Sequence, residues 1–356
     1  MGWAPGRFTL AGEHVDYARG ATLCAATDLG VEVAVRWSRD SVFRVASAGR
    51  VVQRLEPGPA RDIGDRIFAA ARCLEGRKAA PRPVEVGVAA DLPESAGLAS
   101  SAAVVCATLV ALLRLHQRRV PVAEFVDLAL HAERDLVGVP CGPLDQRALV
   151  ESRAGSVVLL DFDSGARTVL RWPWTDLVIV GCDSGEQHDV GGAEYRSRRD
   201  DCDRVLSTLG VDSCQRIDPG ALQAAGLGER LSKRARHLVS ETARARSAAE
   251  AVRAGDAAAL GELMLAGHVS LANEFDAGTP RGDAMVEAAM RVPGVYGARM
   301  VGAGFGGTVI ALCSVASEDR CAGALADAGR RQRGAARRLG LGGGLAELAP
   351  HVILPS

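Results

Sequence analysis

A loop of small residues that opens directly into a long apolar run is the feature that most constrains the fold. It reads ESAGLASSAAVVCATLVALLRLHQ and spans residues 94–117. The apolar run predicts a buried helix, with Ser100 or Ser101 placed to cap it. Small residues let backbone N–H groups approach a ligand closely, and the positive end of a helix favours an anion. The segment therefore predicts a phosphate site, although a plain capped helix after a tight turn has the same sequence pattern.

Residue usage excludes the common nucleotide-binding folds. A Walker-type loop needs a lysine directly after a glycine, and protein kinases of the eukaryotic type need a lysine on a strand. The chain has two lysines, Lys78 and Lys233, and neither follows a glycine. The glycine-rich segment GAGFGG (302–307) lacks the dinucleotide-binding spacing and precedes a predicted strand rather than a helix. A phosphate site in this chain must therefore belong to another fold.

Composition is that of an ordinary globular protein of 356 residues, long enough for two domains. The net charge of −1 indicates no global attraction to nucleic acid or to an anionic membrane. The sequence lacks an apolar run of about 18 residues and a secretory signal pattern, so we expect a cytoplasmic protein without a membrane span. Its nine cysteines lack metal-type spacing, which favours buried, reduced thiols.

Strands and helices are expected in mixed order, which favours the α+β class. Strands are expected at 22–37, 41–47 and 50–56 (a hairpin), 82–93, 155–163, 175–185, at both ends of 296–313, and at 351–356. Helices are expected at 62–76 (ending at Gly76), in the apolar run up to 117, at 121–136 with Pro121 as the first helical residue, at 193–207, 235–275 and 318–338. Asp256 is expected to cap a second helix within 235–275. Residues 139–146 and 339–344 are expected to be irregular, and the latter a flexible hinge.

The N-terminal segment GEHVDYARG (12–20) concentrates polar side chains between two glycines, with Arg7 just upstream. A solvated arm is one interpretation of this run. Phosphoryl transfer needs a metal ligand, positive charge and a group that handles the attacking hydroxyl. Glu133, Asp145 and Arg7 are candidates for these roles, although each alone is more often a surface residue.

Several segments together resemble the galactokinases. APGRFTLAGEHVDYARG (4–20) resembles their sugar-binding signature, and VGVPCGPLDQ (137–146) resembles their catalytic-base loop. LPESAGLASSAAV (92–104) resembles the second motif of the wider superfamily of galactokinase, homoserine, mevalonate and phosphomevalonate kinases, the GHMP kinases. HDVGGAEYRSRRDDC (188–202) and VPGVYGARMVGAGFGGTVIAL (292–312) resemble later motifs. The segments occur in family order along most of the chain.

The resemblance implies a fold with two domains and an active site in the cleft between them. Residues 1–160 would form an N-terminal mixed α/β domain, and residues 161–340 a C-terminal ferredoxin-like domain. A final strand within 341–356 could return to the first domain. The implied reaction is ATP-dependent phosphorylation of the anomeric (C1) hydroxyl of a sugar.

The resemblance also implies a role for individual residues. Asp145 would be the base, with Arg7 beside it and beside the sugar. The sugar would be bound by Glu13, His14, Asp16, Gly142 and Tyr195. The phosphates of ATP would be bound by Gly97, Leu98, Ala99, Ser100, Ser101 and Ala102. Mg²⁺ would be bound by Ser101 and Glu133, and the backbone of 302–307 would close over the site.

The chain departs from the galactokinase pattern at a few positions around these residues. Thr9, Val15, Ala18, Ala99 and Ala303 differ from the residues that are usual in the motifs. Galactose is therefore the leading substrate, and the alternatives are an N-acetylhexosamine, a pentose, or a heptose or octose of secondary metabolism. A non-catalytic sugar sensor is the alternative of another class, but the GLASSAA loop keeps its length and both later serines, which favours an enzyme.

Overall fold

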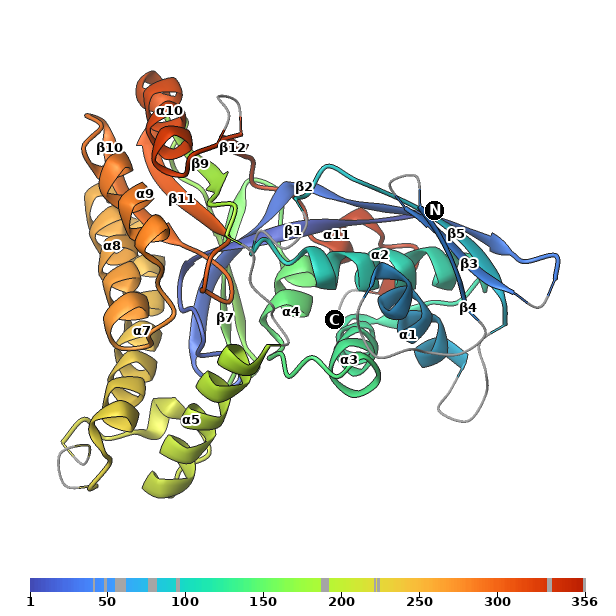
Figure 1. The fold of residues 1–356 in the computed structure, drawn as a ribbon, viewed down its shortest axis with the longest axis horizontal. Coiled ribbons are helices and arrows are strands. Elements are labelled where there is room, and N and C mark those ends of the chain that lie inside the picture. The colour runs from blue at the N-terminus through green and yellow to red at the C-terminus, as the bar shows by residue number, and fades with distance from the viewer. Residues whose placement is uncertain are drawn as a thin grey trace.

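The protein was analysed in a computed structural model, which describes all residues except 41, 48–49, 55–61, 76–81, 94–96, 187–191, 221, 223–224, 332–334 and 355–356. Parts of several sequence-based expectations fall outside the described residues, among them the helix end at Gly76, the start of the small-residue loop at 94–96, and motif residues 188–191. The described chain forms two main sheets with helices packed against them (Figure 1).

The first sheet has seven strands in the order β4-β3-β5-β2-β7-β8, with β1 added to one part of β2. Its strands are β1 (Gly2–Ala11), β2 (Ala21–Trp37), β3 (Phe43–Ser47), β4 (Arg50–Arg54), β5 (Val84–Ala90), β7 (Ser156–Asp161) and β8 (Arg167–Arg171). Four helices accompany it: α1 (Ile63–Glu75), α2 (Ser100–Leu115), α3 (Val122–His131) and α4 (Leu144–Glu151). The apolar helix α2 packs on β1 and β2 and is buried along most of its length. This packing fixes the small-residue loop beside β1.

The second sheet has four antiparallel strands in the order β10-β11-β9-β12. Its strands are β9 (Leu177–Asp183), β10 (Val295–Met300), β11 (Thr308–Ser314) and β12 (Arg337–Leu339). Helices lie between β9 and β10 and between β11 and β12, so the connectivity is ferredoxin-like, as expected. These helices are α5 (Ala193–Leu209), α7 (Glu229–Ala254), α8 (Ala257–Asn273), α9 (Pro280–Met290) and α10 (Glu318–Ala328).

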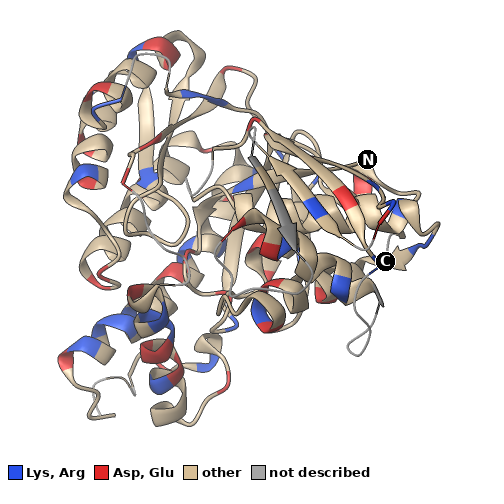
Figure 2. Cartoon of the chain, turned by 45° about the vertical axis from the view of Figure 1, so that its right-hand side comes forward, with Lys and Arg blue, Asp and Glu red and all other residues tan. Residues whose placement is uncertain are grey.

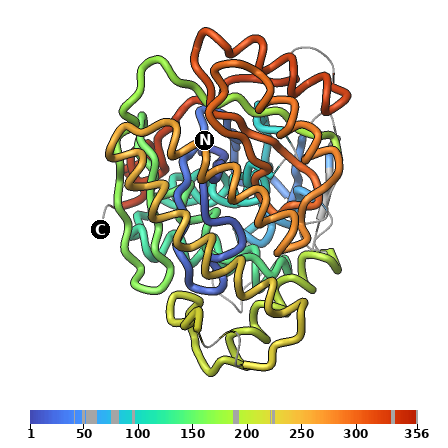
Figure 3. The backbone as a smooth tube through the Cα atoms, turned by 90° about the vertical axis from the view of Figure 1, so that its left-hand side faces the viewer, coloured from blue at the N-terminus to red at the C-terminus, as the bar shows by residue number. Residues whose placement is uncertain are grey.

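The two parts of the chain are joined along the N-terminal strands. Helices α7 and α8 contact β1, and α7 also contacts β2, so both helices pass over the blue N-terminal segment in Figure 3. Near the C-terminus, β13 (Ile353–Leu354) pairs in parallel with β6 (Val120–Pro121). Because β8 still belongs to the first sheet, we propose that the domain boundary lies after Arg171 rather than near residue 160.

The structure corrects several local expectations. Residues 2–11, which were given no element, form β1. The helix predicted to start at Pro121 begins at Val122 and ends in a π-helical turn at Ala132–Val137. Asp145, expected in an irregular loop, lies in the first turn of α4. The helix predicted to reach residue 338 ends at Ala328, and β12 follows it.

Two expectations about glycines and caps have different outcomes. Asp256 does cap α8, because its side chain accepts a hydrogen bond from the N–H of Ala259. The 339–344 segment is packed rather than hinge-like: the N–H of Gly342 donates to the carbonyl of Ala26, and a Cβ on Gly342 would lie 2.0 Å from the carbonyl oxygen of Thr27. Glycine is required there for close approach to β2.

The cysteines, the charged residues and the character of the helices bear on the expectations from composition. All nine cysteines are free, and seven of them are buried, while Cys73 and Cys141 are half-buried. Acidic and basic side chains are interspersed over the described chain (Figure 2), in keeping with its near-zero net charge. Among the described residues, the structure contains no helix with the length and apolar character needed to span a membrane.

Candidate active site

An arginine–aspartate pair lies where β1 meets the first turn of α4. Nη2 of Arg7 is 2.7 Å from Oδ1 of Asp145. Nη1 of Arg7 donates to the carbonyl of Gly97, and its backbone N–H donates to the carbonyl of Leu98. Burial works against the charged guanidinium, but the carboxylates of Asp145 and Glu13 outweigh it and raise the pKa of Arg7. A permanent cation therefore connects the small-residue loop to the carboxylate of Asp145.

The polar N-terminal segment meets the Asp145 loop at Asp16. Oδ2 of Asp16 accepts a hydrogen bond of 3.1 Å from the N–H of Leu144. A Cβ on Gly142 would lie 2.0 Å from the same oxygen, so only glycine fits beside this carboxylate. Burial raises the pKa of Asp16, and the N–H of Leu144 opposes that shift. The sequence predicted that Asp16, Gly142 and Asp145 serve one site, and the structure brings them together.

Glu13 and His14 connect the same segment to the glycine-rich turn between β10 and β11. Oε1 of Glu13 accepts from the N–H of Gly302 at 2.9 Å. Nε2 of His14 lies 3.0 Å from the carbonyl of Ala303, and Nδ1 lies 3.0 Å from the hydroxyl of Tyr17. Because a carbonyl only accepts, Nε2 carries the proton and Nδ1 accepts from Tyr17. Burial and the neighbouring His237 lower the pKa of His14 to about 3, so the ring is neutral.

Aromatic rings surround His14 and bring helix α5 to the site. The His14 ring stacks on Phe275 at a centroid distance of 4.4 Å. Tyr195, on the first turn of α5, is buried, and its ring lies 5.8 Å from that of His14. Tyr195 was predicted to contact the sugar, and the structure places it beside the other predicted sugar-binding residues.

Backbone atoms of the small-residue loop and of the glycine-rich turn approach each other closely at Gly97 and Gly302. Gly97 and Gly302 both have positive φ, at 74° and 92°. A Cβ on Gly302 would lie 2.7 Å from the Cα of Gly97, so both loops depend on glycine for their close approach. The predicted phosphate-binding loop and the glycine-rich turn that was expected to close over the site are therefore neighbours in space.

The start of α2 differs from the sequence-based expectation. Neither Ser100 nor Ser101 caps the helix: the N-cap is Ala99, in the left-handed conformation at φ 61°, and it makes no side-chain capping bond. The side chains of Leu98 and Ala102 point into the core, so only their backbone could face a ligand. The N-terminus of α2 therefore has no side-chain cap, and a helix N-terminus is a favourable place for an anion.

Ser101 and Glu133 form a pair of oxygen donors at this helix start. The Ser101 hydroxyl donates to Oε1 of Glu133 at 2.5 Å. Glu133 lies in the π-helical turn after α3, is buried, and has a pKa raised by that burial. The part of the chain that the structure describes contains no group of three or more His, Cys, Asp or Glu arranged to hold a metal. A cation bound here would therefore have the oxygens of Ser101 and Glu133 as protein ligands, and its remaining ligands would have to come from bound substrate or water.

Sequence reasoning missed residues that hold this pair. Nε of Arg66, on α1, donates to the Ser101 hydroxyl at 2.6 Å, and Nε2 of Gln146 donates to Oε2 of Glu133. Gln146 follows Asp145 directly in the VGVPCGPLDQ segment, so that resemblance could have suggested it. No signal in the sequence around Arg66 pointed to the site.

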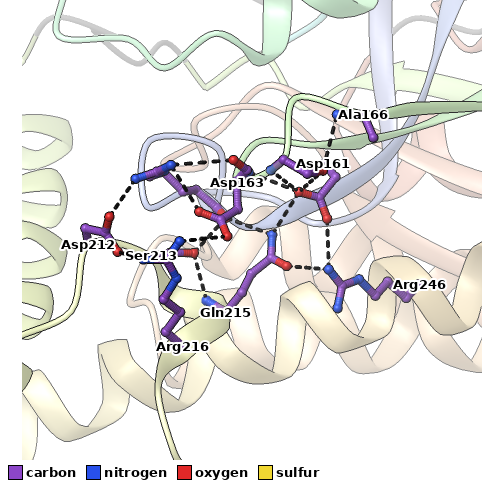
Figure 4. A network of polar contacts seen from close by, with 10 residues as sticks. Asp161, Asp163, Ala166, Asp212, Ser213, Gln215, Arg216 and Arg246 are labelled. Atoms are coloured by element: carbon purple, nitrogen blue, oxygen red, sulfur yellow. Dashed lines mark hydrogen bonds and ion pairs between the residues drawn. The ribbon is translucent and has the colours of Figure 1, made fainter.

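The end of the polar N-terminal segment is anchored by a network of ion pairs, shown in Figure 4. Nη1 of Arg19 donates to Asp212 at 2.9 Å, and Nη2 lies 3.2 Å from Oδ1 of Asp163. The carbonyl of Arg19 accepts from the side chains of Ser213 and Gln215. The segment is therefore tied both to the β7–β8 turn and to the chain after α5, which holds its position between the two sheets.

Comparisons with known proteins agree with this arrangement. Residues 2–37 match the family model of the galactokinase galactose-binding signature. Residues 65–153 match the GHMP kinases N terminal domain, and residues 248–331 match the GHMP kinases C terminal model.

Similar proteins cover most of the chain. The galactokinase of Thermotoga petrophila is 32% identical over 314 residues, covering 87% of this chain and 88% of its own. Human galactokinase is 33% identical over 322 residues, covering 87% and 82%. The crystal structure of Lactococcus lactis galactokinase complexed with galactose superposes with a TM-score of 0.87 at 25% identity, covering 96% of this chain and 94% of that chain. The chain thus belongs to the galactokinase family of the GHMP kinases and is an ATP-dependent sugar kinase.

Proposed function

We propose that the protein transfers the γ-phosphoryl group of ATP to the anomeric (C1) hydroxyl of galactose. The observation that carries this proposal is the ion pair between Arg7 and Asp145, because it joins three parts of the site. Asp145 lies one residue from Leu144, whose N–H binds Asp16, and Arg7 binds the carbonyl of Gly97 in the small-residue loop. A sugar hydroxyl on the Asp16 side and a phosphate on the Gly97 side would therefore meet at this pair.

In the proposed reaction Asp145 accepts the proton of the attacking hydroxyl. An anomeric hydroxyl is more acidic than an ordinary alcohol, because the ring oxygen withdraws charge. Phosphoryl transfer passes through a loose transition state, so the nucleophile needs to lose its proton only late, and a carboxylate is a sufficient base. The guanidinium of Arg7 stabilises the charge that develops on the transferring group.

Burial of the departures from the family pattern supports galactose over other sugars. Val15 and Ala18 are fully buried in the hydrophobic core formed by the second sheet and its helices, among residues such as Cys202 and Leu206. Their side chains therefore lie behind the sugar-binding segment, whereas His14, directly before Val15, and Asp16, directly after it, keep the residue types of the family signature. A substitution behind the segment changes packing rather than direct sugar contacts.

A panel of sugars tests the substrate. With ATP held in excess, we expect galactose to give the highest kcat/KM in a coupled ADP-release assay against an N-acetylhexosamine, a pentose and a heptose. A single substituent that a polar site cannot accommodate typically costs about tenfold or more. If one of the other three sugars is phosphorylated more efficiently, galactose is the wrong assignment, although the kinase chemistry stands.

Magnesium fits the donor pair at the start of α2. Mg²⁺ prefers oxygen ligands and is usually held by one or two protein groups together with substrate phosphates. Ser101 and Glu133 supply a hydroxyl and a carboxylate within 2.5 Å of each other, next to the helix N-terminus that would hold those phosphates. We propose that they bind the cation, which would neutralise phosphate charge. Gln146 would keep the carboxylate of Glu133 oriented.

Replacing Glu133 by Gln is expected to raise the Mg²⁺ concentration for half-maximal activity about ten- to a hundredfold, because a charged ligand is lost. The readouts are an activity titration with Mg²⁺ and calorimetric titration of Mg²⁺·ATP. Glu124→Gln, an exposed position on α3, is the matched control. A Glu133→Gln variant that titrates like the control would refute the metal assignment.

A further inference from the structure

Two arginines hold the loop between the π-helical turn and α4, here named the base loop (residues 139–143). The carbonyl of Cys141 accepts from Nε and Nη2 of Arg134, at 3.2 and 3.0 Å. It also accepts from Nη1 of Arg199 at 3.2 Å, and the same nitrogen donates to the carbonyl of Pro140 at 2.5 Å. Among the contacts described for these two carbonyls, Arg199 is the donor that comes from the second part of the chain.

Arg199 also faces the sugar-binding segment. Its guanidinium carbon lies 5.4 Å from the centroid of the Tyr17 ring, and the Tyr17 hydroxyl bonds His14. One helical turn earlier on α5, the buried Tyr195 lies against His14 and Tyr17. A single turn of α5 therefore touches the sugar-binding segment through Tyr195 and the base loop through Arg199.

We infer that Arg199 is a positioning residue that couples the sugar-binding segment to the base loop, so that Asp145 is held in place when the sugar-binding residues are in place. The inference rests on the proposed role of Asp145. No motif in the sequence assigned a function to Arg199. Arginine suits this task because Nη1 can donate to both adjacent carbonyls while the planar face of the guanidinium packs on an aromatic ring. A lysine at this position would supply a point charge without the planar face.

Backbone N–H groups make the other hydrogen bonds described for the base loop. The N–H of Val139 donates to the carbonyl of Glu133, and the N–H of Cys141 donates within the loop to the carbonyl of Val139. Directly after the loop, the N–H of Leu144 donates to Asp16. Loss of Arg199 would leave the Pro140 carbonyl without its described donor and leave Cys141 held by Arg134 alone. Arg134 follows Glu133, so the loop would keep its attachment next to the proposed metal ligand. On the sugar side, only the bond from the N–H of Leu144 to Asp16 would remain among the contacts described here.

Steady-state kinetics of Arg199→Ala, Arg199→Lys and Arg204→Ala test the inference. Arg199→Ala is expected to lower kcat/KM for the sugar about ten- to a hundredfold, the effect of losing a charged hydrogen bond. The loss should appear both as a higher sugar KM and as a lower kcat, while the KM for ATP stays within about twofold of wild type. Arg199→Lys should recover part of the loss. Arg204, exposed on the same helix, is the control and should behave as wild type.

Asp145→Asn on the same assay separates this inference from the proposed function. If Asp145→Asn is inactive and Arg199→Ala has wild-type kcat and sugar KM, Arg199 does not position the loop, and the role of Asp145 stands. If Asp145→Asn is active, the base assignment itself is wrong and the inference falls with it. Equal losses toward sugar and ATP, together with a lower melting temperature for Arg199→Ala, would make Arg199 a general structural residue and overturn the coupling.

Discussion

Replacing Asp145 by Asn is expected to lower turnover about 10²–10⁴-fold, the usual range for loss of a general base. Asparagine has nearly the same size, and its side-chain oxygen can still accept from Nη2 of Arg7, which lies 2.7 Å from Oδ1 in the wild type. What it cannot do is take the proton of the attacking hydroxyl. The change should therefore appear in kcat, while the affinities for sugar and ATP persist.

The measurement is turnover and calorimetric affinity for both ligands on one preparation of the variant. Asp127→Asn, at an exposed position on α3, is the control and should be as active as wild type. Turnover of Asp145→Asn close to that of the control would mean that positioning by Arg7 and the cation suffices without a carboxylate base. Loss of ligand affinity together with turnover would point to a misfolded site instead.

The parts of the site that could be predicted from sequence are those in which the functional residues lie in short runs. Arg7 and Asp16 lie in the 4–20 segment, whose resemblance to the galactokinase signature implied their roles. Glu133 was a candidate as a carboxylate on the helix that follows the small-residue loop. The structure places Arg7 beside Asp145, Asp16 beside Leu144, and Glu133 beside Ser101. The buried run after the small-residue loop likewise predicted α2 to within a few residues.

Elements with mixed signals were predicted less well. β1 contains Pro5, Gly6 and Arg7, which break the alternation of a strand, yet it pairs with β2 along most of its length with irregularities between Pro5 and Arg7. The neighbouring strand and α2 supply the burial that local propensity lacks. The same holds for α4. Its first turn directly follows Gly142 and Pro143, and these two residues led to the prediction of an irregular loop.

Residues that brace the site from far along the chain leave no local pattern. His237, on α7, lies 3.1 Å from the carbonyl of Glu13, and Arg299, on β10, donates to the carbonyl of Leu10. Each is separated from its partner by more than two hundred residues in sequence. Only the packing of α7 and β10 against the N-terminal strands brings them together, so periodicity and composition could not indicate them.

Among the buried residues on α7 and β10 that hold the N-terminal strands in place, Glu241 is expected to have the largest effect on stability. It lies on α7, is fully buried, and its Oε1 accepts from the N–H of Gly12 at 2.9 Å and from Nη1 of Arg299 at 3.0 Å. Its Oε2 accepts from Nε of Arg244 at 2.6 Å. Burial alone would raise the pKa of this carboxyl, but Arg299 and Arg244 outweigh it and hold the pKa well below the ordinary value. The carboxylate therefore neutralises a fully buried arginine and anchors the start of the polar N-terminal segment at Gly12.

Replacing Glu241 by Gln is expected to cost about 3–5 kcal/mol of folding free energy, because the guanidinium of Arg299 would stay buried without its counter-charge. The group has a depressed pKa in the folded state, so its contribution is complete above the unfolded-state pKa of about 4.5 and is lost progressively as the pH falls below it. The stability gap between wild type and variant should therefore be largest at neutral pH and should narrow in acid.

Urea unfolding midpoints at pH 7 and near pH 4 measure this gap, with Glu250→Gln as the matched control. Glu250 is on the same helix and pairs with Arg253, but both side chains are exposed, so the midpoint should not move. Gln has a single acceptor oxygen, so it cannot accept both from Gly12 and Arg299 on one side and from Arg244 on the other, as Glu241 does. The anchor of Gly12 is therefore weakened, and the sugar KM of Glu241→Gln should also rise at temperatures where the variant is folded. A Glu241→Gln midpoint equal to that of Glu250→Gln would show that the buried network contributes no net stability, and that Arg299 is accommodated there by its bonds to the carbonyls of Leu10 and Met300.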